Sequence, residues 1–110
     1  MKKPWCIDSS EAAPLVADAN TVFVDVREDE EVAEGVIPGA LHIPLHELEE
    51  RVTEIPAGKK IITVCAHGMR SQEALMILKQ SGLSPVFSLE GGMVVWQSQG
   101  HPIGFLPSTR

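Results

Sequence analysis

Cys65 lies between a predicted strand and a predicted helix, where a thiol could act as a nucleophile. It follows the short apolar run 61–64 and precedes residues 71–80, whose apolar residues recur at helical spacing. A cysteine between a buried strand and a helix lies beside the free N–H groups of the helix N-terminus, and these groups bind anions and favour a thiolate. The spacing therefore predicts a reactive thiolate at Cys65.

The six residues from Cys65 to Arg70 read Cys-Ala-His-Gly-Met-Arg and predict a tight loop. Gly68 can adopt dihedral angles that are closed to other residues, so the loop can turn its successive N–H groups toward the sulfur. The guanidinium of Arg70 can hold an oxyanion through two parallel hydrogen bonds. Such a site suits covalent catalysis on an anionic substrate. The alternative is that Cys65 is only a small buried residue at a strand end.

Strand-like and helix-like segments alternate along the chain and would hold this loop in place. Apolar, β-branched runs predict strands at residues 5–7, 21–26, 41–44, 60–64 and 86–89. Helical patterns and caps predict helices at residues 11–19, 45–53, 71–80 and 93–99, with one or two turns in the acidic run 28–31. The alternation indicates an α/β protein with a parallel sheet, in which sites lie at the carboxyl ends of the strands.

Length and composition predict one globular domain over residues 1–110, with a core at about 5–103 and a tail at 104–110. From His101 onward we expect the chain to be partly ordered at most. A net charge of -6 argues against nucleic acid as a partner. No apolar run approaches the roughly 20 residues of a membrane span, and no apolar segment follows the first lysines. We therefore expect a cytoplasmic protein with no membrane partner.

Only two cysteines are present, Cys6 and Cys65, which is typical of free thiols in a reducing compartment. A disulfide between them stays open as an alternative. His42 and His46 are expected near the surface, and neither is paired with a carboxylate at metal-ligand spacing. The sequence thus predicts neither a metal site nor a cofactor.

Four separated segments together resemble one family. They are VFVDVREDEE, GVIPGALHIP, CAHGMRS and LEGGMVVW, in this order. The chain resembles single-domain rhodaneses, the sulfurtransferases of the rhodanese-like superfamily, from about residue 7 to residue 103. The resemblance implies a three-layer α/β/α fold with a central five-stranded parallel sheet. The sequence departs from the family at Val36, where a histidine is common.

The resemblance also implies a mechanism in which Cys65 alternates between thiol and persulfide. A donor such as thiosulfate would give its sulfane sulfur to Cys65, and cyanide or a thiol would remove it, with ping-pong kinetics. A thioredoxin-like or other protein could be the acceptor. The substrate-binding residues would be Ala66, His67, Gly68, Met69 and Arg70. Arg70 would bind the oxyanion end of the donor, whereas His67 is either a rim contact or a bystander.

Two other functions compete with this interpretation. Rhodanese-like domains also serve as non-catalytic binding or regulatory modules, although the presence of Cys65 and Arg70 favours activity. Rhodanese-like phosphatases and arsenate reductases carry Cys-x5-Arg, whereas four residues separate Cys65 from Arg70 here. The shorter loop favours a sulfur over a phosphate. Asp25 and Arg27 are expected to have structural roles, and Trp96 is expected in the core.

Overall fold

Five short strands form the centre of the protein in a computed structural model, which describes residues 3–107. They are β1 (Cys6–Ile7), β2 (Thr21–Asp25), β3 (Leu41–His42), β4 (Lys60–Val64) and β5 (Val86–Leu89). Their order across the sheet is β1-β5-β4-β2-β3, and each neighbouring pair is parallel. The predicted five-stranded parallel sheet is confirmed, with β4 as its central strand.

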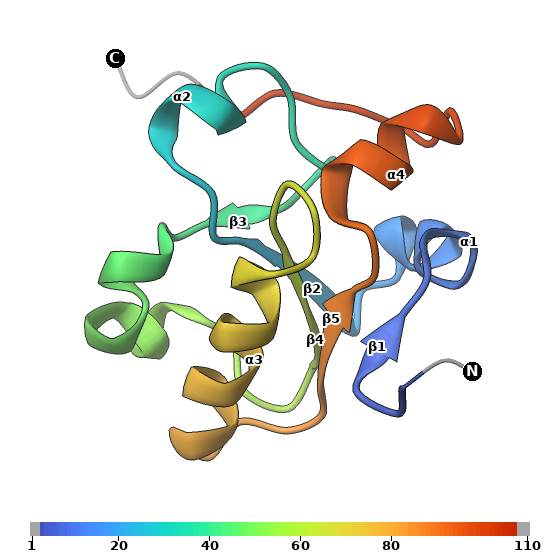
Figure 1. Ribbon diagram of the computed structural model, residues 1–110. Helices are drawn as coiled ribbons and strands as arrows, with labels where there is room; N and C mark the ends of the chain where they lie inside the picture. Colours follow the sequence, from blue (N-terminus) through green and yellow to red (C-terminus); the bar gives the residue numbers. More distant parts are fainter. Residues whose placement is uncertain (1–2, 108–110) are drawn as a thin grey trace.

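The helical segments are short, apart from the helix that follows β4. The α-helices are α1 (Ser9–Ala12), α2 (Asp29–Val32), α3 (Arg70–Gln80) and α4 (Gly92–Ser98). Three 3₁₀ segments accompany them: η1 (Ala13–Ala17), η2 (Leu45–Glu47) and η3 (Glu49–Glu54). Figure 1 shows α2, α4 and the loop before α3 gathered at one end of the sheet.

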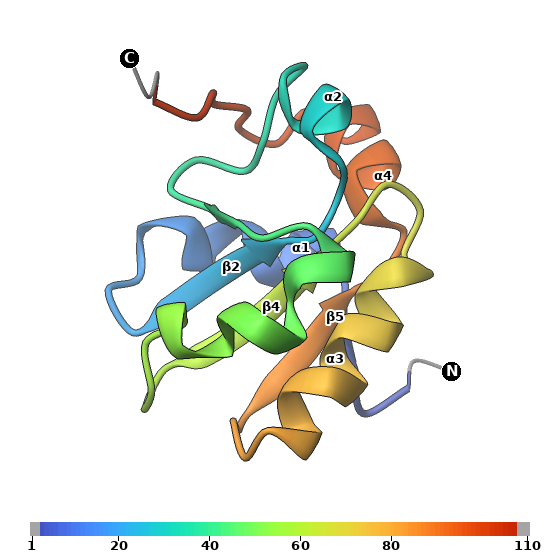
Figure 2. The same ribbon diagram turned by 90° about the vertical axis from the view of Figure 1, so that its left-hand side faces the viewer.

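Side chains that alternate along the strands fill a core on each face of the sheet. On β2, Val24 belongs to the core beneath α3, η2 and η3, whereas its neighbour Phe23 belongs to the core beneath α1, η1 and α4. Trp96 is fully buried in this second core, as predicted. Two helical layers therefore enclose the sheet, and Figure 2 shows α3 on the opposite side of it from α1. This is the expected three-layer arrangement.

Two predicted helices differ from those in the structure. The first α-helix starts earlier, at Ser9, where Asp8 caps it in a capping box with Glu11. It continues as a 3₁₀ segment because Pro14 lacks an N–H for the next α-helical hydrogen bond. Residues 45–54 form η2 and η3 in place of one surface helix. Their backbone is non-helical at Arg51, next to the β-branched pair 52–53, which favours helices poorly.

The first residues of the segment from His101, which we expected to be partly ordered at most, are bound to the rest of the protein. Gly104 exchanges two backbone hydrogen bonds with Val36, at 2.9 and 2.8 Å. The buried indole of Trp96 donates to the carbonyl of Pro102 at 2.7 Å. The segment is held because it satisfies polar groups that the core would otherwise leave unpaired.

A buried ion pair closes the carboxyl end of β2. Arg27 Nη2 donates to Asp25 Oδ2 at 2.8 Å, and both side chains are almost completely buried. The same nitrogen donates to the carbonyl of Gly35 at 2.8 Å. Arg27 also donates its backbone N–H to Asp25 Oδ1. Asp25 and Arg27 thus have the structural roles that we expected, and the pair ties the segment before β3 to the sheet.

Candidate active site

Cys65 is the first residue beyond β4 and is 1% exposed. It lies at the carboxyl end of the central strand, and ligand-binding and active sites of parallel α/β proteins are found at this edge of the sheet. The backbone N–H of Gly68 donates to Cys65 Sγ at 3.0 Å, so the loop curls back over the sulfur. Gly68 has a φ of 98°, which other residues rarely adopt. The structure therefore shows the curled loop predicted from the glycine.

Helix α4 holds the backbone of this loop from the other side. Met93 donates its N–H to the carbonyl of Cys65 at 2.9 Å, and Val94 donates to that of Ala66 at 3.0 Å. Gly92 makes the close approach possible, since a Cβ there would lie 2.4 Å from the Cys65 oxygen. These contacts keep the first two loop carbonyls turned toward α4.

Two buried serines lie behind the sulfur. Cys65 Sγ is 3.5 Å from Ser71 Oγ, in a hydrogen bond that the thiol donates. Ser71 Oγ is in turn 2.7 Å from Ser88 Oγ of β5. Ser71 also belongs to the first turn of α3, whose free N–H end is positive. A thiolate at Cys65 can therefore receive hydrogen bonds from the Gly68 amide and, after rotation of the hydroxyl, from Ser71.

Arg70 begins α3 and forms a two-pronged ion pair with Glu31 of α2. Its Nη1 and Nη2 donate to Glu31 Oε1 and Oε2, each at 2.8 Å. The hydrogen bond to Arg70 is the main reason that the pKa of Glu31 falls to about 2. The pKa of Arg70 is raised, first by the hydrogen bond to Glu31 and to a smaller extent by the charge of Cys65. In this structure the guanidinium thus faces a carboxylate.

The structure brings some of the predicted site residues to the sulfur and leaves others at the rim. Gly68 contacts the sulfur directly, and Ala66 contributes its carbonyl to the link with α4. His67 and Met69 are exposed, and 75% of Met69 is accessible to solvent. Of the predicted loop residues, Cys65 and Gly68 are therefore the buried ones, and they lie against the buried Ser71.

Sequence reasoning missed four residues that shape the site. Ser71 was placed only at the start of the helix after the loop, although its hydroxyl lies beside the sulfur. Ser88 lies in the buried strand β5. A serine is unusual in such a strand, and this could have indicated that Ser88 has a polar partner. Glu31 lies in an acidic run, which is more often a solvated surface. Gly92 appeared only within the segment LEGGMVVW, because its contact with Cys65 depends on the packing of α4.

Cys6 is not a partner of Cys65. It is aligned with Ser88 on the edge strand β1, and β5 lies between β1 and β4. Two strand spacings amount to about 10 Å, which exceeds the roughly 7 Å between the Cα atoms of a disulfide. Both cysteines are thiols. The alternative of a Cys6–Cys65 bridge is therefore wrong.

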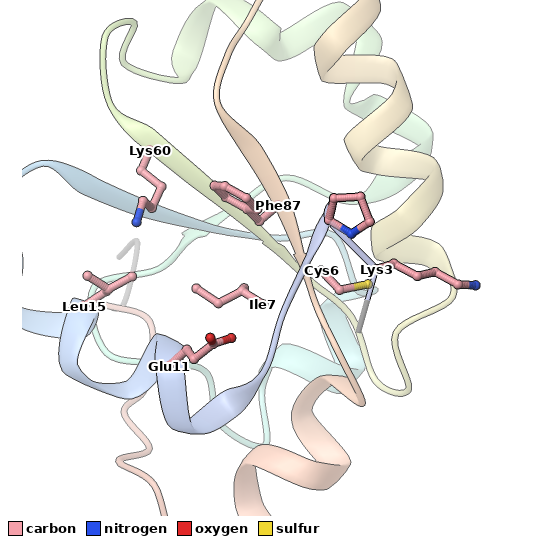
Figure 3. Close-up of a pocket in the computed structure, with 8 residues that line it drawn as sticks. Lys3, Cys6, Ile7, Glu11, Leu15, Lys60 and Phe87 are labelled. Atoms are coloured by element: carbon pink, nitrogen blue, oxygen red, sulfur yellow. The ribbon is translucent and has the colours of Figure 1, made fainter. Parts of the chain in front are cut away.

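Cys6 instead lines a hollow of about 470 Å³, far from the loop. Figure 3 shows this hollow with Lys60 and Phe87 above it and Leu15 and Glu11 below. Lys60 is the first residue of β4, whereas Cys65 follows the last. A strand of this length separates them by about 16 Å. The hollow is therefore no part of the site at Cys65.

Residues 3–107 provide neither a cluster of metal ligands nor a membrane-spanning helix. No group of three or more His, Cys, Asp or Glu residues in this part of the chain could hold a metal ion. In the same range, no helix has both the length and the apolar character needed to cross a membrane.

The fold and the loop define a class, the parallel α/β proteins with a buried cysteine at the carboxyl end of the central strand. Comparison with known proteins is more specific. Residues 8–99 match the model of the rhodanese-like domain. The chain belongs to the rhodanese-like family, as the four sequence segments indicated.

Relatives and solved structures agree with this assignment. The chain is 39% identical over 98 residues to a protein of Allochromatium vinosum named sulfurtransferase. This alignment covers 88% of this chain and 92% of that protein. The chain is 32% identical to the thiosulfate sulfurtransferase GlpE of Pseudomonas syringae, in an alignment that covers 80% of this chain and 83% of that protein. The crystal structure of a rhodanese-related protein from Thermoplasma volcanium superposes with a TM-score of 0.84 at 32% identity, covering 92% of this chain and 98% of that one.

Proposed function

We propose that this protein is a cytoplasmic sulfurtransferase that carries a sulfane sulfur as a persulfide on Cys65. The observation that carries the proposal is the hydrogen bond of 3.0 Å from the Gly68 amide to Cys65 Sγ, in a loop that opens α3. The similarity to proteins named sulfurtransferases supports the same class of reaction.

The reaction consists of two displacements at sulfur. In the first, the Cys65 thiolate attacks the outer sulfur of a donor such as thiosulfate, the S–S bond of the donor breaks, and sulfite leaves with the bonding electrons. In the second, cyanide or a thiolate attacks the terminal sulfur of the persulfide, and the Cys65 thiolate leaves. The two half-reactions share one enzyme intermediate, which gives ping-pong kinetics.

The loop residues have distinct proposed roles in these steps. The amides from Ala66 to Arg70 hold the negative terminal sulfur of the persulfide, with the Gly68 amide closest to the cysteine. Arg70 binds the oxyanion end of the donor, and the exposed His67 and Met69 form the rim that an acceptor meets. A small thiol or a thioredoxin-like protein can serve as acceptor, because the attack needs only an accessible thiolate.

The proposal can be tested by intact-mass measurement. Incubation with thiosulfate should add about 32 Da, the mass of one sulfur atom, and cyanide should remove it. The Cys65→Ser variant should gain nothing, whereas Cys6→Ser should gain the same mass as the wild type because Cys6 lies two strands away from β4. No adduct with thiosulfate, a thiosulfonate or a thiol persulfide would rule out the proposed function and leave the non-catalytic binding module as the better explanation.

A further inference from the structure

The cation that should receive an anionic donor already has an anionic partner within the protein. Arg70 is the only Lys or Arg in the loop 65–70, and both of its terminal nitrogens donate to Glu31. Figures 1 and 2 both show α2, which carries Glu31, at the same end of the sheet as this loop. The two-pronged arrangement uses both oxygens of the carboxylate, as an oxyanion of the donor would.

Glu31 is held in position independently of Arg70. Its Oε1 also accepts the backbone N–H of Glu28 at 2.9 Å, which completes the capping box of α2. The carbonyl of Glu31 accepts from Arg27 Nη1 at 3.4 Å, and Arg27 is itself paired with the buried Asp25. Because this framework fixes the carboxylate, little side-chain entropy is lost when the ion pair forms.

An anionic donor therefore meets two obstacles at Arg70. Glu31 occupies the two-pronged face formed by Nη1 and Nη2, so a donor must displace the carboxylate or use the remaining N–H groups. The charge of the donor is also repelled by the carboxylate and by its acidic neighbours 28–30. The repulsion grows with the negative charge of the donor, since the Coulomb energy is proportional to it, whereas the competition for N–H groups is the same for donors that differ only in charge.

We propose that Glu31 is a specificity-determining residue that competes with the donor for Arg70 and disfavours dianionic donors relative to those with less charge. The inference rests on the proposed function, because it concerns the first half-reaction at Cys65. Glu31 does not touch the reacting sulfur atoms, and it acts by positioning and neutralising Arg70.

The variant Glu31→Gln isolates this effect. Its amide oxygen can still accept the N–H of Glu28, so the cap of α2 is kept. The matched control is Glu30→Gln, which removes the same charge from the same helical turn. Glu30 is exposed, and its side chain makes no hydrogen bond or ion pair with residues 3–107.

Two donors that differ by one charge provide the measurement. Thiosulfate is a dianion, whereas methanethiosulfonate is a monoanion that gives the same sulfur and releases methanesulfinate. For Glu31→Gln we expect kcat/KM to rise about tenfold with thiosulfate and about threefold with methanethiosulfonate, because half the charge gives half the Coulomb energy. Added salt should reduce both ratios. For Glu30→Gln we expect a change of less than about twofold with either donor.

The outcomes separate this inference from the proposed function. If wild type and variant both form the Cys65 persulfide but Glu31→Gln leaves the thiosulfate kcat/KM unchanged, the competition is refuted and the sulfurtransferase stands. An equal rise in Glu30→Gln would also refute it, because the effect would then come from the general acidity of α2. If neither protein gains a sulfur from any donor, the proposed function itself fails.

Discussion

The replacement of Gly92 by alanine should disturb the active-site loop through a direct clash with its backbone. Gly92 has a φ of 59°, and a Cβ on it would lie 2.4 Å from the oxygen of Cys65 and 2.5 Å from that of Ala66. Real Cβ atoms do not approach backbone oxygens so closely. Either α4 or the loop must move, and the backbone carbonyls concerned are those that the α4 amides hold.

The expected cost has two parts. The left-handed conformation costs a non-glycine residue about 1–2 kcal/mol. Forced overpacking of a well-packed region typically adds about 1–3 kcal/mol. We therefore expect Gly92→Ala to lower the free energy of unfolding by about 2–5 kcal/mol. A shift of the loop by about 1 Å would also slow sulfur transfer by about 100-fold, since such displacements of reacting groups have effects of this size.

Gly58→Ala is the matched control for the backbone part of the cost. Gly58 has a φ of 82°, and none of the described atoms beyond its chain neighbours would lie within 4 Å of a Cβ there. Urea unfolding should show a loss of only about 1–2 kcal/mol for this variant, and transfer from thiosulfate to cyanide should be unchanged. If both variants lost the same stability and Gly92→Ala kept full transfer activity, the contact with α4 would not be what positions Cys65.

Two further predictions concern the ion pairs around the site. Arg27→Met should lower the free energy of unfolding, measured in urea, by about 3–5 kcal/mol, because it leaves the buried Asp25 carboxylate without its cationic partner. Adding Asp25→Asn to this variant should recover part of the loss. Glu31 contributes about 1 kcal/mol through its pair with Arg70, since both side chains are about one-third exposed. Its pKa falls from 4.5 to about 2 on folding, so this stability is present above pH 4.5 and is lost as the pH falls toward 2. The difference in unfolding free energy between wild type and Glu31→Gln should vanish over that range, whereas Glu30→Gln should show no such dependence.

The sequence predicted the sheet and the place of Cys65 because both depend on local patterns. A run of β-branched residues such as 60–64 has few alternatives to a buried strand, and the residue after such a strand must lie at the edge of the sheet. The helix ends were harder to predict. Pro14 lies inside the helix predicted at residues 11–19, but whether the chain stops, bends or tightens into a 3₁₀ segment there depends on what packs against it.

The pairing of Glu31 with Arg70 could not be predicted locally, because 39 positions separate the two residues. Taken alone, Glu31 resembled a surface charge, and Arg70 resembled a substrate-binding cation. They meet because β2 and β4 are neighbours in the sheet, so the segments that follow these strands emerge at the same edge. A strand order inferred together with the motif would have placed α2 beside the loop.

The ion pair also changes how the thiolate must be stabilised. An unpaired Arg70 would place a full positive charge near Cys65, but Glu31 cancels much of its field at a distance. The raised pKa of Arg70 owes more to Glu31 than to Cys65, so the guanidinium interacts mainly with the carboxylate. The sulfur must then depend on neutral donors, which are the Gly68 amide, the Ser71 hydroxyl and the amino end of α3. These groups are buried, so in the proposed reaction they would stabilise negative charge on the sulfur whether or not a donor displaces Glu31.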